Sequence, residues 1–325
     1  MGATPDDVYL SDLRQISFQP VFILGVHRSG TSILYKMLAA TGSFNPLTAY
    51  HIVHYTDLLT NHKQGTEEAV RRQLTESLRR EGLANRKIDS MEVTADLAEE
   101  YGFLLNRKTT AMYLKPKNMP LFVEMGKKLM YIAGNSRPLL LKNPYDLSHF
   151  LYIKQVFPNA KFVFIHRRPV KTISSTLKAF QVIFQEYHPY MAYLWGNYKK
   201  FYRNPLVIWL FRLMFITVPE IGVIYVTRAT AKATSYYLRN IQKLPPEDYV
   251  TLTYEEFCKH PEQTIEDIMR RLSIPIQTPI DAAANMNPRK AKIDDAVQKL
   301  TPYIFRSLKD YCDTFRYTME TEEVS

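Results

Sequence analysis

The chain has 325 residues, of which 46% are hydrophobic and 23% charged, a composition typical of a folded globular protein rather than a disordered one. Its 42 basic and 32 acidic residues give a formal net charge of +10, which favours an anionic partner such as a nucleotide, nucleic acid or anionic lipid. Two cysteines, Cys258 and Cys312, are too few for a disulfide framework or a metal-binding cluster, so a reducing compartment is expected.

Residues 1–15 are polar and acidic, and they lack the basic start and the apolar centre of a signal peptide. The chain contains no run of about 18 apolar residues, so no membrane-spanning helix is expected. We therefore expect a cytoplasmic protein, and peripheral contact with a membrane surface is left open.

Residues 20–38 read PVFILGVHRSGTSILYKML and predict a strand, a loop and a helix in that order. Residues 21–24 form a short apolar run typical of a buried strand. The helix that follows the loop carries its apolar side chains on one side, and Gly42 is expected to end it. A loop of this geometry directs backbone N–H groups and a helix N-terminus at a phosphate group.

The loop differs from an ordinary P-loop at one position. Gly25 and Gly30 have the spacing of the motif GxxxxGK[ST], but Thr31 occupies the lysine position and is followed by Ser32. In nucleotide triphosphatases that lysine reaches the β- and γ-phosphates. The loop therefore predicts an anion site rather than ATP hydrolysis, with Arg28 as its cation.

After this helix, residues 43–59 are irregular and aromatic, and they carry His51 and His54. Three further helices are expected, at residues 66–82, 91–107 and 119–133. The many arginine and glutamate side chains of the first of these helices predict a solvated outer face.

Three more short strands are expected, at residues 139–141, 161–166 and 249–253. Strands that alternate with helices predict βαβ units, and therefore an α/β fold with a parallel sheet flanked by helices. We expect residues 1–325 to form a single domain of this kind. Because ligands bind at the carboxyl ends of parallel strands, the groups that follow the strands are expected to form one site. These groups are the loop at residues 25–32, Lys142, Arg167 and Tyr254.

Residues 184–226 form an aromatic-rich segment that holds both tryptophans, Trp195 and Trp209. One interpretation is a helical core packed against the sheet. The other is a helical insertion that binds the acceptor substrate through the two tryptophans and also rests on a membrane surface.

Two blocks of the sequence resemble one enzyme family. GVHRSGTS resembles the 5′-phosphosulfate loop of sulfotransferases that use 3′-phosphoadenosine-5′-phosphosulfate (PAPS). Residues 139–178 resemble the block that binds the 3′-phosphate, especially in bacterial and tyrosylprotein sulfotransferases. The resemblance covers roughly residues 20–60 and 138–180, and the segment 249–261 adds a weaker match.

The resemblance implies a P-loop-like sulfotransferase fold, PAPS as the cofactor, 3′,5′-adenosine bisphosphate as its product, and no metal. Arg167 and Ser175 have the eight-residue spacing of the family pair that binds the 3′-phosphate. Lys142 is similar to the family lysine that contacts the sulfuryl group, whereas Arg168 departs from the aspartate common in the family. The expected cofactor-binding residues are His27, Arg28, Ser29, Gly30, Thr31, Ser32, Arg167, Ser175 and Tyr254.

The general base is predicted to be a histidine. Related enzymes often place a glutamate some twenty residues after the loop, but no acidic residue lies between Arg28 and Asp57. His51 lies near the expected position, and His54 is the second choice for the base and an expected acceptor-binding residue. With His51, Lys142 and Arg28 as the catalytic groups, activity is expected to rise through about pH 6–7 as an ordinary imidazole loses its proton.

The function predicted is transfer of a sulfuryl group from PAPS to a hydroxyl of a hydrophobic small molecule or lipid. Two alternatives remain at this point. A nucleoside or small-molecule kinase would need the P-loop lysine that Thr31 replaces. A non-catalytic basic protein that binds membrane or nucleic acid would need no such site, but no nucleic-acid-binding motif is found, so no nucleic acid partner is expected.

Overall fold

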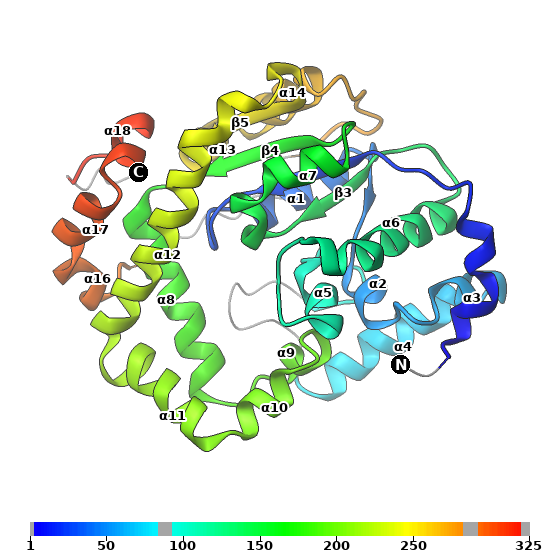
Figure 1. Ribbon diagram of the computed structural model, residues 1–325, viewed down its shortest axis with the longest axis horizontal. Coiled ribbons are helices and arrows are strands. Elements are labelled where there is room, and N and C mark those ends of the chain that lie inside the picture. Colours follow the sequence, from blue (N-terminus) through cyan, green and yellow to red (C-terminus); the bar gives the residue numbers. More distant parts are fainter. Residues whose placement is uncertain (1–2, 84–92, 282–291, 320–325) are drawn as a thin grey trace.

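The computed structural model describes residues 3–83, 93–281 and 292–319, and its centre is a five-stranded parallel sheet (Figure 1). The strand order is β2-β3-β1-β4-β5. The strands are β1 Pro20–Leu24, β2 Asn45–Pro46, β3 Leu139–Lys142, β4 Lys161–His166 and β5 Tyr249–Thr253. The parallel sheet and the four strands expected from the sequence are therefore confirmed, whereas β2 was not expected because two residues give no periodic signal.

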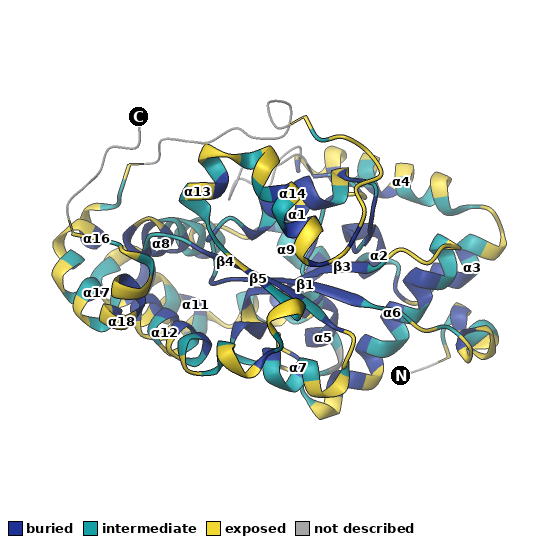
Figure 2. Ribbon diagram, turned by 90° about the horizontal axis from the view of Figure 1, so that it is seen from above, coloured by how far each residue is buried: buried dark blue, intermediate teal, exposed yellow. Residues whose placement is uncertain are grey.

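Helices cover both faces of this sheet, as expected for parallel strands that read as continuous apolar runs. All five residues of β1 are buried, and it pairs with β3 on one side and β4 on the other. The helices that flank the sheet are α1 Thr31–Ala40, α2 Ala49–Val53, α3 Leu58–Lys63, α4 Glu67–Arg80, α5 Gly102–Lys108, α6 Met119–Ala133, α7 Phe150–Val156, α13 Tyr254–Lys259 and α14 Pro261–Arg271. Figure 2 shows α1 and α14 on one side of the sheet and α6 and α7 on the other.

The apolar side chains of the strands belong to two separate cores, one on each face of the sheet. Phe22 and Phe162 stack face to face on the side of α6 and α7, with ring centroids 5.7 Å apart. Val21 and Ile23 point the other way and pack with Leu34 of α1 and the apolar face of α14. The alternation of side chains along each strand therefore divides one buried sheet between two helical layers.

Two of the expected elements are corrected by the structure. The helix expected at residues 91–107 begins only at Gly102, and residues 91 and 92 lie outside the described residues. The backbone carbonyls of Ala95 and Leu97 instead accept hydrogen bonds from Tyr50 and Ala49 of α2. These tertiary hydrogen bonds replace the helical ones, which local propensity alone cannot predict. The stretch expected to be irregular holds β2, α2 and the start of α3.

The segment at residues 184–226 is helical and forms an outer arc with α8 Pro169–Gln185, seen along the left and lower edges of Figure 1. It contains α9 Pro189–Leu194, α10 Tyr198–Arg203, α11 Pro205–Arg212, the π-helix η4 Leu213–Thr217 and the start of α12 Pro219–Asn240. Its buried side chains, among them Phe184, Phe215 and Val223, join a third core with α8, α12, α16 Asp295–Lys299, α17 Thr301–Ser307 and α18 Lys309–Phe315. Tyr190 and Leu194 of α9 belong instead to the core on the α6 and α7 side of the sheet, so the segment packs both on other helices and on the core of the sheet.

Within the described residues, no individual helix is both long and apolar enough to cross a membrane. One pair, Pro205–Thr217 and Pro219–Lys243, meets that test jointly by length and composition, and a bend of 95° separates its two arms.

A buried ion pair fastens the N-terminal 3-10 helix η1 Pro5–Leu13 to α3 and α6. Asp6 is fully buried, and its carboxylate accepts hydrogen bonds from the backbone N–H groups of Leu59 and Thr60. Its second partner is the ammonium of Lys128, at 2.9 Å and also buried. Removal of the Asp6 carboxylate would leave these two N–H groups without that acceptor, and would leave the buried Lys128 ammonium with the partly exposed Glu124, at 3.2 Å, as its acidic partner.

We therefore expect Asp6→Ala to lower the free energy of unfolding by roughly 3 kcal/mol in urea titration. Asp12→Ala is the matched control, because Asp12 pairs with Lys63 at the partly exposed surface, and its loss should be much smaller. Equal losses in the two variants would show that the buried pair does not anchor η1.

Candidate active site

The loop between β1 and α1 contains two glycines, and a side chain at either position would displace neighbouring atoms. A Cβ atom at Gly25 would lie 2.5 Å from the carbonyl oxygen of Ile165. The backbone of the loop is therefore too close to β4 for any side chain at this position. Gly30 has φ +102° and caps α1, and Arg28 also has a left-handed backbone with φ +67°. Alternation of right- and left-handed residues turns successive N–H groups to one side, as in anion-binding nests.

One hydroxyl in this loop has no partner of its own. Ser29 is fully buried, and its Oγ atom makes no hydrogen bond among the described residues. A buried polar atom without a partner calls for an explanation, and at a phosphate-binding loop a bound anion supplies one.

The lysine that the loop lacks is contributed by the neighbouring strand. Lys142 ends β3, is fully buried, and donates a hydrogen bond from Nζ to Ser32 Oγ at 2.9 Å. Because β3 pairs with β1 in parallel, the carboxyl end of β3 lies beside the first turn of α1. The loop sequence thus has Thr31 where a P-loop has lysine, but Lys142 from β3 brings an ammonium group to the same turn of α1.

Two arginines and a serine form the other side of the loop. Arg28 donates from Nε to Ser175 Oγ at 3.0 Å, and Arg167 donates from Nη1 to the carbonyl oxygen of Arg28 at 3.0 Å. The sequence paired Arg167 with Ser175, and the structure adds Arg28 as the direct partner of that serine. Guanidinium groups and a hydroxyl gathered in this way are donors suited to a phosphate or sulfate.

The ring of Tyr254 packs against the arginine side of this cluster. Its ring lies 4.1 Å from the guanidinium carbon of Arg167, and a Cβ atom at Gly30 would lie 2.3 Å from its Cδ2 atom. Burial above all raises the pKa of Tyr254 to about 12, so the phenol stays neutral. Groups that follow β1, β3, β4 and β5 thus meet at one edge of the sheet.

Comparison with known proteins identifies the family. A sequence profile of the sulfotransferase family matches residues 20–204, which is more than half of the chain. The chain belongs to this family. No curated protein sequence matches this sulfotransferase.

Solved structures with a similar fold are bacterial sulfotransferases. Sulfotransferase STF9 from Mycobacterium avium superposes with a TM-score of 0.65 at 16% identity, over 98% of this chain and 81% of that one. Sulfotransferase STF1 from Mycobacterium tuberculosis H37Rv gives a TM-score of 0.53 at 12% identity, over 95% of this chain and 80% of that one. At these identities the likeness shows the fold, which is the sulfotransferase fold expected from the sequence.

His27 lies in the loop of this sulfotransferase without adding charge to it at neutral pH. Its surroundings lower its pKa to about 4, first by desolvation and then through the charges of Arg28 and Lys142. Its ring contacts Tyr145, with centroids 4.5 Å apart. The positive charge at the loop is therefore carried by lysine and arginine.

His51 occupies a buried position in α2. Its Nδ1 atom lies 3.1 Å from the backbone nitrogen of Thr48, and its Nε2 atom lies 3.3 Å from Nη2 of Arg71. Burial and then the charge of Arg71 lower its pKa to about 3. His54 pairs with Asp57, with Nδ1 and Oδ2 3.0 Å apart. The role of either histidine as base stays a prediction.

Two buried carboxylates, Glu99 and Asp146, were expected from the sequence only as bases to test after the two histidines. Glu99 is fully buried and accepts a hydrogen bond from Tyr190 of α9 at 2.6 Å. Asp146 accepts hydrogen bonds from Tyr101, Asn143 and the Leu114 backbone, and burial raises its pKa to about 6. The full set of donors on Asp146 indicates a structural role. No sequence signal separates such carboxylates from exposed ones, because Glu99 stands in an acidic stretch.

The two tryptophans lie in different environments. Trp195 packs its ring against Tyr198 and Phe201, and its Nε1 atom is buried without a hydrogen-bond partner among the described residues. Trp209 lies on the outer face of α11 and is 58% exposed. Binding of an acceptor by either side chain remains a prediction.

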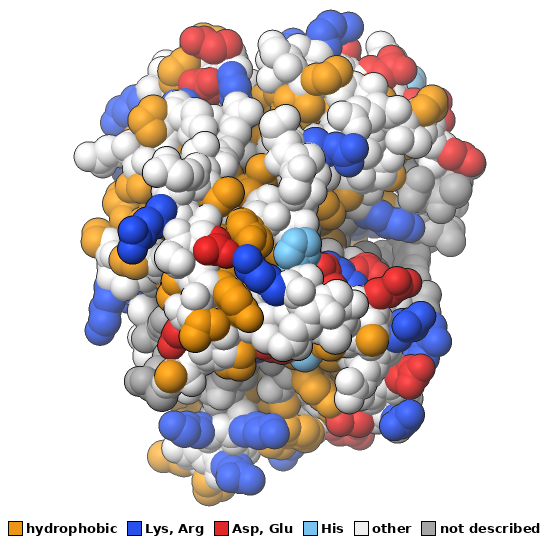
Figure 3. Space-filling model, turned by 90° about the vertical axis from the view of Figure 1, so that its right-hand side faces the viewer, with side chains coloured by type: hydrophobic (Ala, Val, Ile, Leu, Met, Phe, Trp, Pro, Cys, Tyr) orange, Lys and Arg blue, Asp and Glu red, His pale blue; other side chains and the backbone are white. Residues whose placement is uncertain are grey.

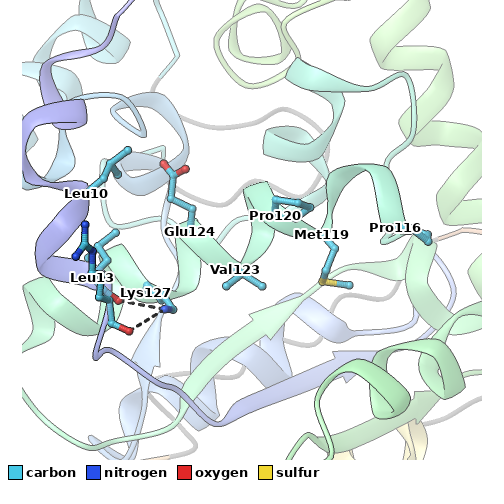
Figure 4. A pocket seen from close by; sticks show the side chains of 9 residues that line it. Leu10, Leu13, Pro116, Met119, Pro120, Val123, Glu124 and Lys127 are labelled. Atoms are coloured by element: carbon cyan, nitrogen blue, oxygen red, sulfur yellow. Dashed lines mark hydrogen bonds between the residues drawn. The ribbon is translucent and has the colours of Figure 1, made fainter.

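A separate groove lies between η1 and α6 (Figure 4). It is lined mainly by apolar side chains, including Leu10, Leu13, Met119 and Val123. Lys127 crosses it and donates a hydrogen bond to the carbonyl of Leu13, in the segment that leads into β1. The loop follows β1 at its other end, so the groove is not part of the candidate site.

The contact between Gly30 and Tyr254 can be tested by a single methyl group. Gly30→Ala should displace the Tyr254 ring and with it Arg167, and so abolish binding of inorganic pyrophosphate in calorimetry and lower the melting temperature. Gly65→Ala is the matched control, since Gly65 has φ +67° but no atom near the added methyl. If the two variants bind pyrophosphate equally, the ring does not support the loop.

Proposed function

We propose that this sulfotransferase transfers the sulfuryl group of PAPS to a hydroxyl group of an acceptor. The observation that carries this proposal is the convergence of Arg28, Lys142 and Arg167 on one glycine-flanked loop. Family membership establishes the sulfotransferase class, and the cofactor and the oxygen acceptor are what we add to it.

The residues present fit the anionic groups of this cofactor. We assign the loop residues 27–32, with the free hydroxyl of Ser29 and the side chain of Arg28, to the phosphosulfate. Arg167 and Ser175 would hold the 3′-phosphate, with Tyr254 supporting Arg167 through its ring. No group of His, Cys, Asp and Glu side chains suited to a metal ion occurs in the part of the chain described, and we propose none.

The bound cofactor supplies a sulfuryl group whose leaving group is a stabilised bisphosphate. In the proposed transfer a bond would form between the acceptor oxygen and sulfur, the bond from sulfur to the 5′-phosphate oxygen would break, and the acceptor proton would pass to the base. We assign to Lys142 and Arg28 the stabilisation of the negative charge that would develop on these oxygens, and their contacts near the loop support this assignment. Both cations are held by serine hydroxyls, so they need little rearrangement.

The kinase alternative is disfavoured by the partner of Ser32. In P-loop enzymes the hydroxyl at this position binds Mg²⁺. Here it accepts a hydrogen bond from the ammonium of Lys142, so this hydroxyl already has a cationic partner. Thr31 in place of the motif lysine also argues against a kinase.

For the base we propose His51, with His54 as the second choice. Its low pKa means that the ring is already neutral and able to accept a proton at any physiological pH. An imidazole of such low pKa accepts a proton only weakly, so an anionic cofactor nearby would be needed to raise its pKa during turnover. Glu99, buried against Tyr190, is the carboxylate to test beside it.

The acceptor that we propose is a hydrophobic alcohol, either a small molecule or a lipid, bound with the help of His54, Trp195 and Trp209. The aromatic side chains of the outer arc support this class. Two free cysteines support a cytoplasmic location, and the exposed Trp209 supports peripheral contact with a membrane.

The nucleotide preference tests the cofactor. We expect calorimetry to show much tighter binding of 3′,5′-adenosine bisphosphate than of ATP, and Arg167→Ala to weaken the former at least about tenfold, the scale of one charge-assisted hydrogen bond. Arg270→Ala removes the same charge at the surface of α14 and should leave affinity unchanged. Equal affinities for the two nucleotides would contradict the assignment of PAPS.

The base is tested by kinetics. His51→Ala should lower kcat by about 10²–10⁴ with nucleotide affinity nearly unchanged, whereas His54→Ala should lower it far less. Because the pKa of His51 is about 3 in the free protein, the profile of kcat/KM should be flat between pH 5 and 7, in place of the rise expected from the sequence. Near-normal kcat in His51→Ala together with a large loss in Glu99→Gln would assign the base to Glu99.

A further inference from the structure

The exposed apolar side chains of the protein are concentrated at one bend. Seven of the fourteen large hydrophobic side chains that are exposed among the described residues lie between residues 206 and 225. We call these seven the elbow patch: Leu206, Trp209, Leu210, Ile216, Val218, Ile221 and Tyr225. Scattered exposed apolar residues are normal on a protein surface, but a contiguous group marks a contact with a partner.

The side chains of the elbow patch are exposed and are not part of the buried packing of α11 and α12 against the rest of the protein. On the inner side of α11, Ile208 is buried, and Phe211 packs against Phe184 with ring centroids 4.7 Å apart. Leu206 and Leu210 lie on the outer side and are 70% and 48% exposed. A helix that is apolar on both sides needs an apolar environment on the second side as well.

The elbow itself is a sharp bend between α11 and α12. The two arms form an angle of 95°, and neither is long and apolar enough to span a bilayer alone. Such an elbow can lower its tip, with Ile216 and Val218, to the depth of the lipid headgroups while its arms remain at the surface.

Basic side chains flank the patch on both sides. Lys199, Lys200 and Arg203 are exposed on α10, and Arg228 and Lys232 follow Tyr225 on the exposed side of α12. Between residues 199 and 232 the chain has six basic residues and one acidic residue, Glu220, which pairs with Lys299. Elsewhere, on the face that lies to the right in Figure 1, basic and acidic side chains are interspersed (Figure 3). The charge around the elbow therefore complements an anionic surface.

The composition of the patch favours lipid over nucleic acid. Five of its seven side chains are aliphatic and offer no face on which a base can stack. Aliphatic side chains with a tryptophan and a tyrosine, ringed by lysine and arginine, are typical of protein surfaces that lie in the lipid interface.

One end of the elbow patch adjoins the candidate active site. Tyr225 lies on α12, which packs against the 3-10 helix η3 Pro144–Ser148 that holds Tyr145. Tyr145 in turn contacts His27 of the loop, at 4.5 Å between ring centroids. The helix that carries one end of the elbow patch is therefore packed on the turn whose tyrosine contacts the loop.

We propose that the elbow patch docks on an anionic lipid bilayer and that the acceptor is a membrane-resident alcohol that enters the site past Tyr225 and Tyr145. The second half of this rests on the sulfuryl transfer proposed above, whose bond changes stay the same. The docking itself needs no turnover.

Docking is measured by co-sedimentation with vesicles of phosphatidylcholine alone or with about a third of phosphatidylglycerol. The protein should bind the anionic vesicles at least about tenfold more tightly and lose this preference in high salt. The double variant Leu206→Asp and Leu210→Asp should lose at least about tenfold in binding. Val8→Asp is the matched control, because Val8 is 74% exposed on η1.

Fluorescence locates the contact within the protein. In Trp195→Phe the only tryptophan left is Trp209, whose emission should shift to shorter wavelength on addition of anionic vesicles. Lys199→Glu with Lys200→Glu should lower vesicle binding, whereas Lys259→Glu on α13 should not.

Each variant is also tested for its melting temperature and for binding of 3′,5′-adenosine bisphosphate, which should both match the unaltered protein. Absence of vesicle binding by the unaltered protein, or equal binding by the double aspartate variant, overturns the docking. So does a dimer that the aspartates dissociate without any vesicle binding, because the patch would then cover a second copy of the chain. Vesicle binding without bisphosphate binding would instead refute the proposed function and leave the docking in place.

Discussion

The contact on which the site depends is the hydrogen bond from the Lys142 ammonium to the Ser32 hydroxyl in the first turn of α1. It places a buried positive charge at the N-terminus of a helix, where the backbone dipoles are already positive. An anion is the one kind of ligand that such a place favours strongly. The parallel pairing of β1 and β3 makes the contact possible, since it aligns the carboxyl ends of two strands that are far apart in the chain.

His27 adds no pH-dependent charge to the loop in the physiological range. The pKa values of His27 and His51 are lowered to about 4 and about 3 by burial and by neighbouring cations. Lysine and arginine side chains keep their charge throughout this range. The two histidines therefore add no positive charge in this range, and proton transfer by His51 stays a prediction.

The helical arc joins this site to the outer surface. Tyr190 of α9 donates to the buried Glu99, so the arc is tied to the chain beside β2. From there α10 and α11 lead to the elbow, and α12 returns over the turn that holds Tyr145. One continuous stretch of chain therefore runs from the contact with Glu99 to the exposed elbow patch.

The sequence by itself determined the β1 loop, the parallel α/β sheet and the family, because glycine spacing and short apolar runs are local signals. It also named Lys142, Arg167 and Tyr254 as neighbours, since parallel strands end at a common edge. Only the tertiary structure decided that Arg28 bonds to Ser175, that Lys142 bonds to Ser32, and that residues 93–101 are not helical. These contacts join segments up to 147 residues apart, and burial, which sets the pKa of His51, depends on neighbours that no local pattern contains.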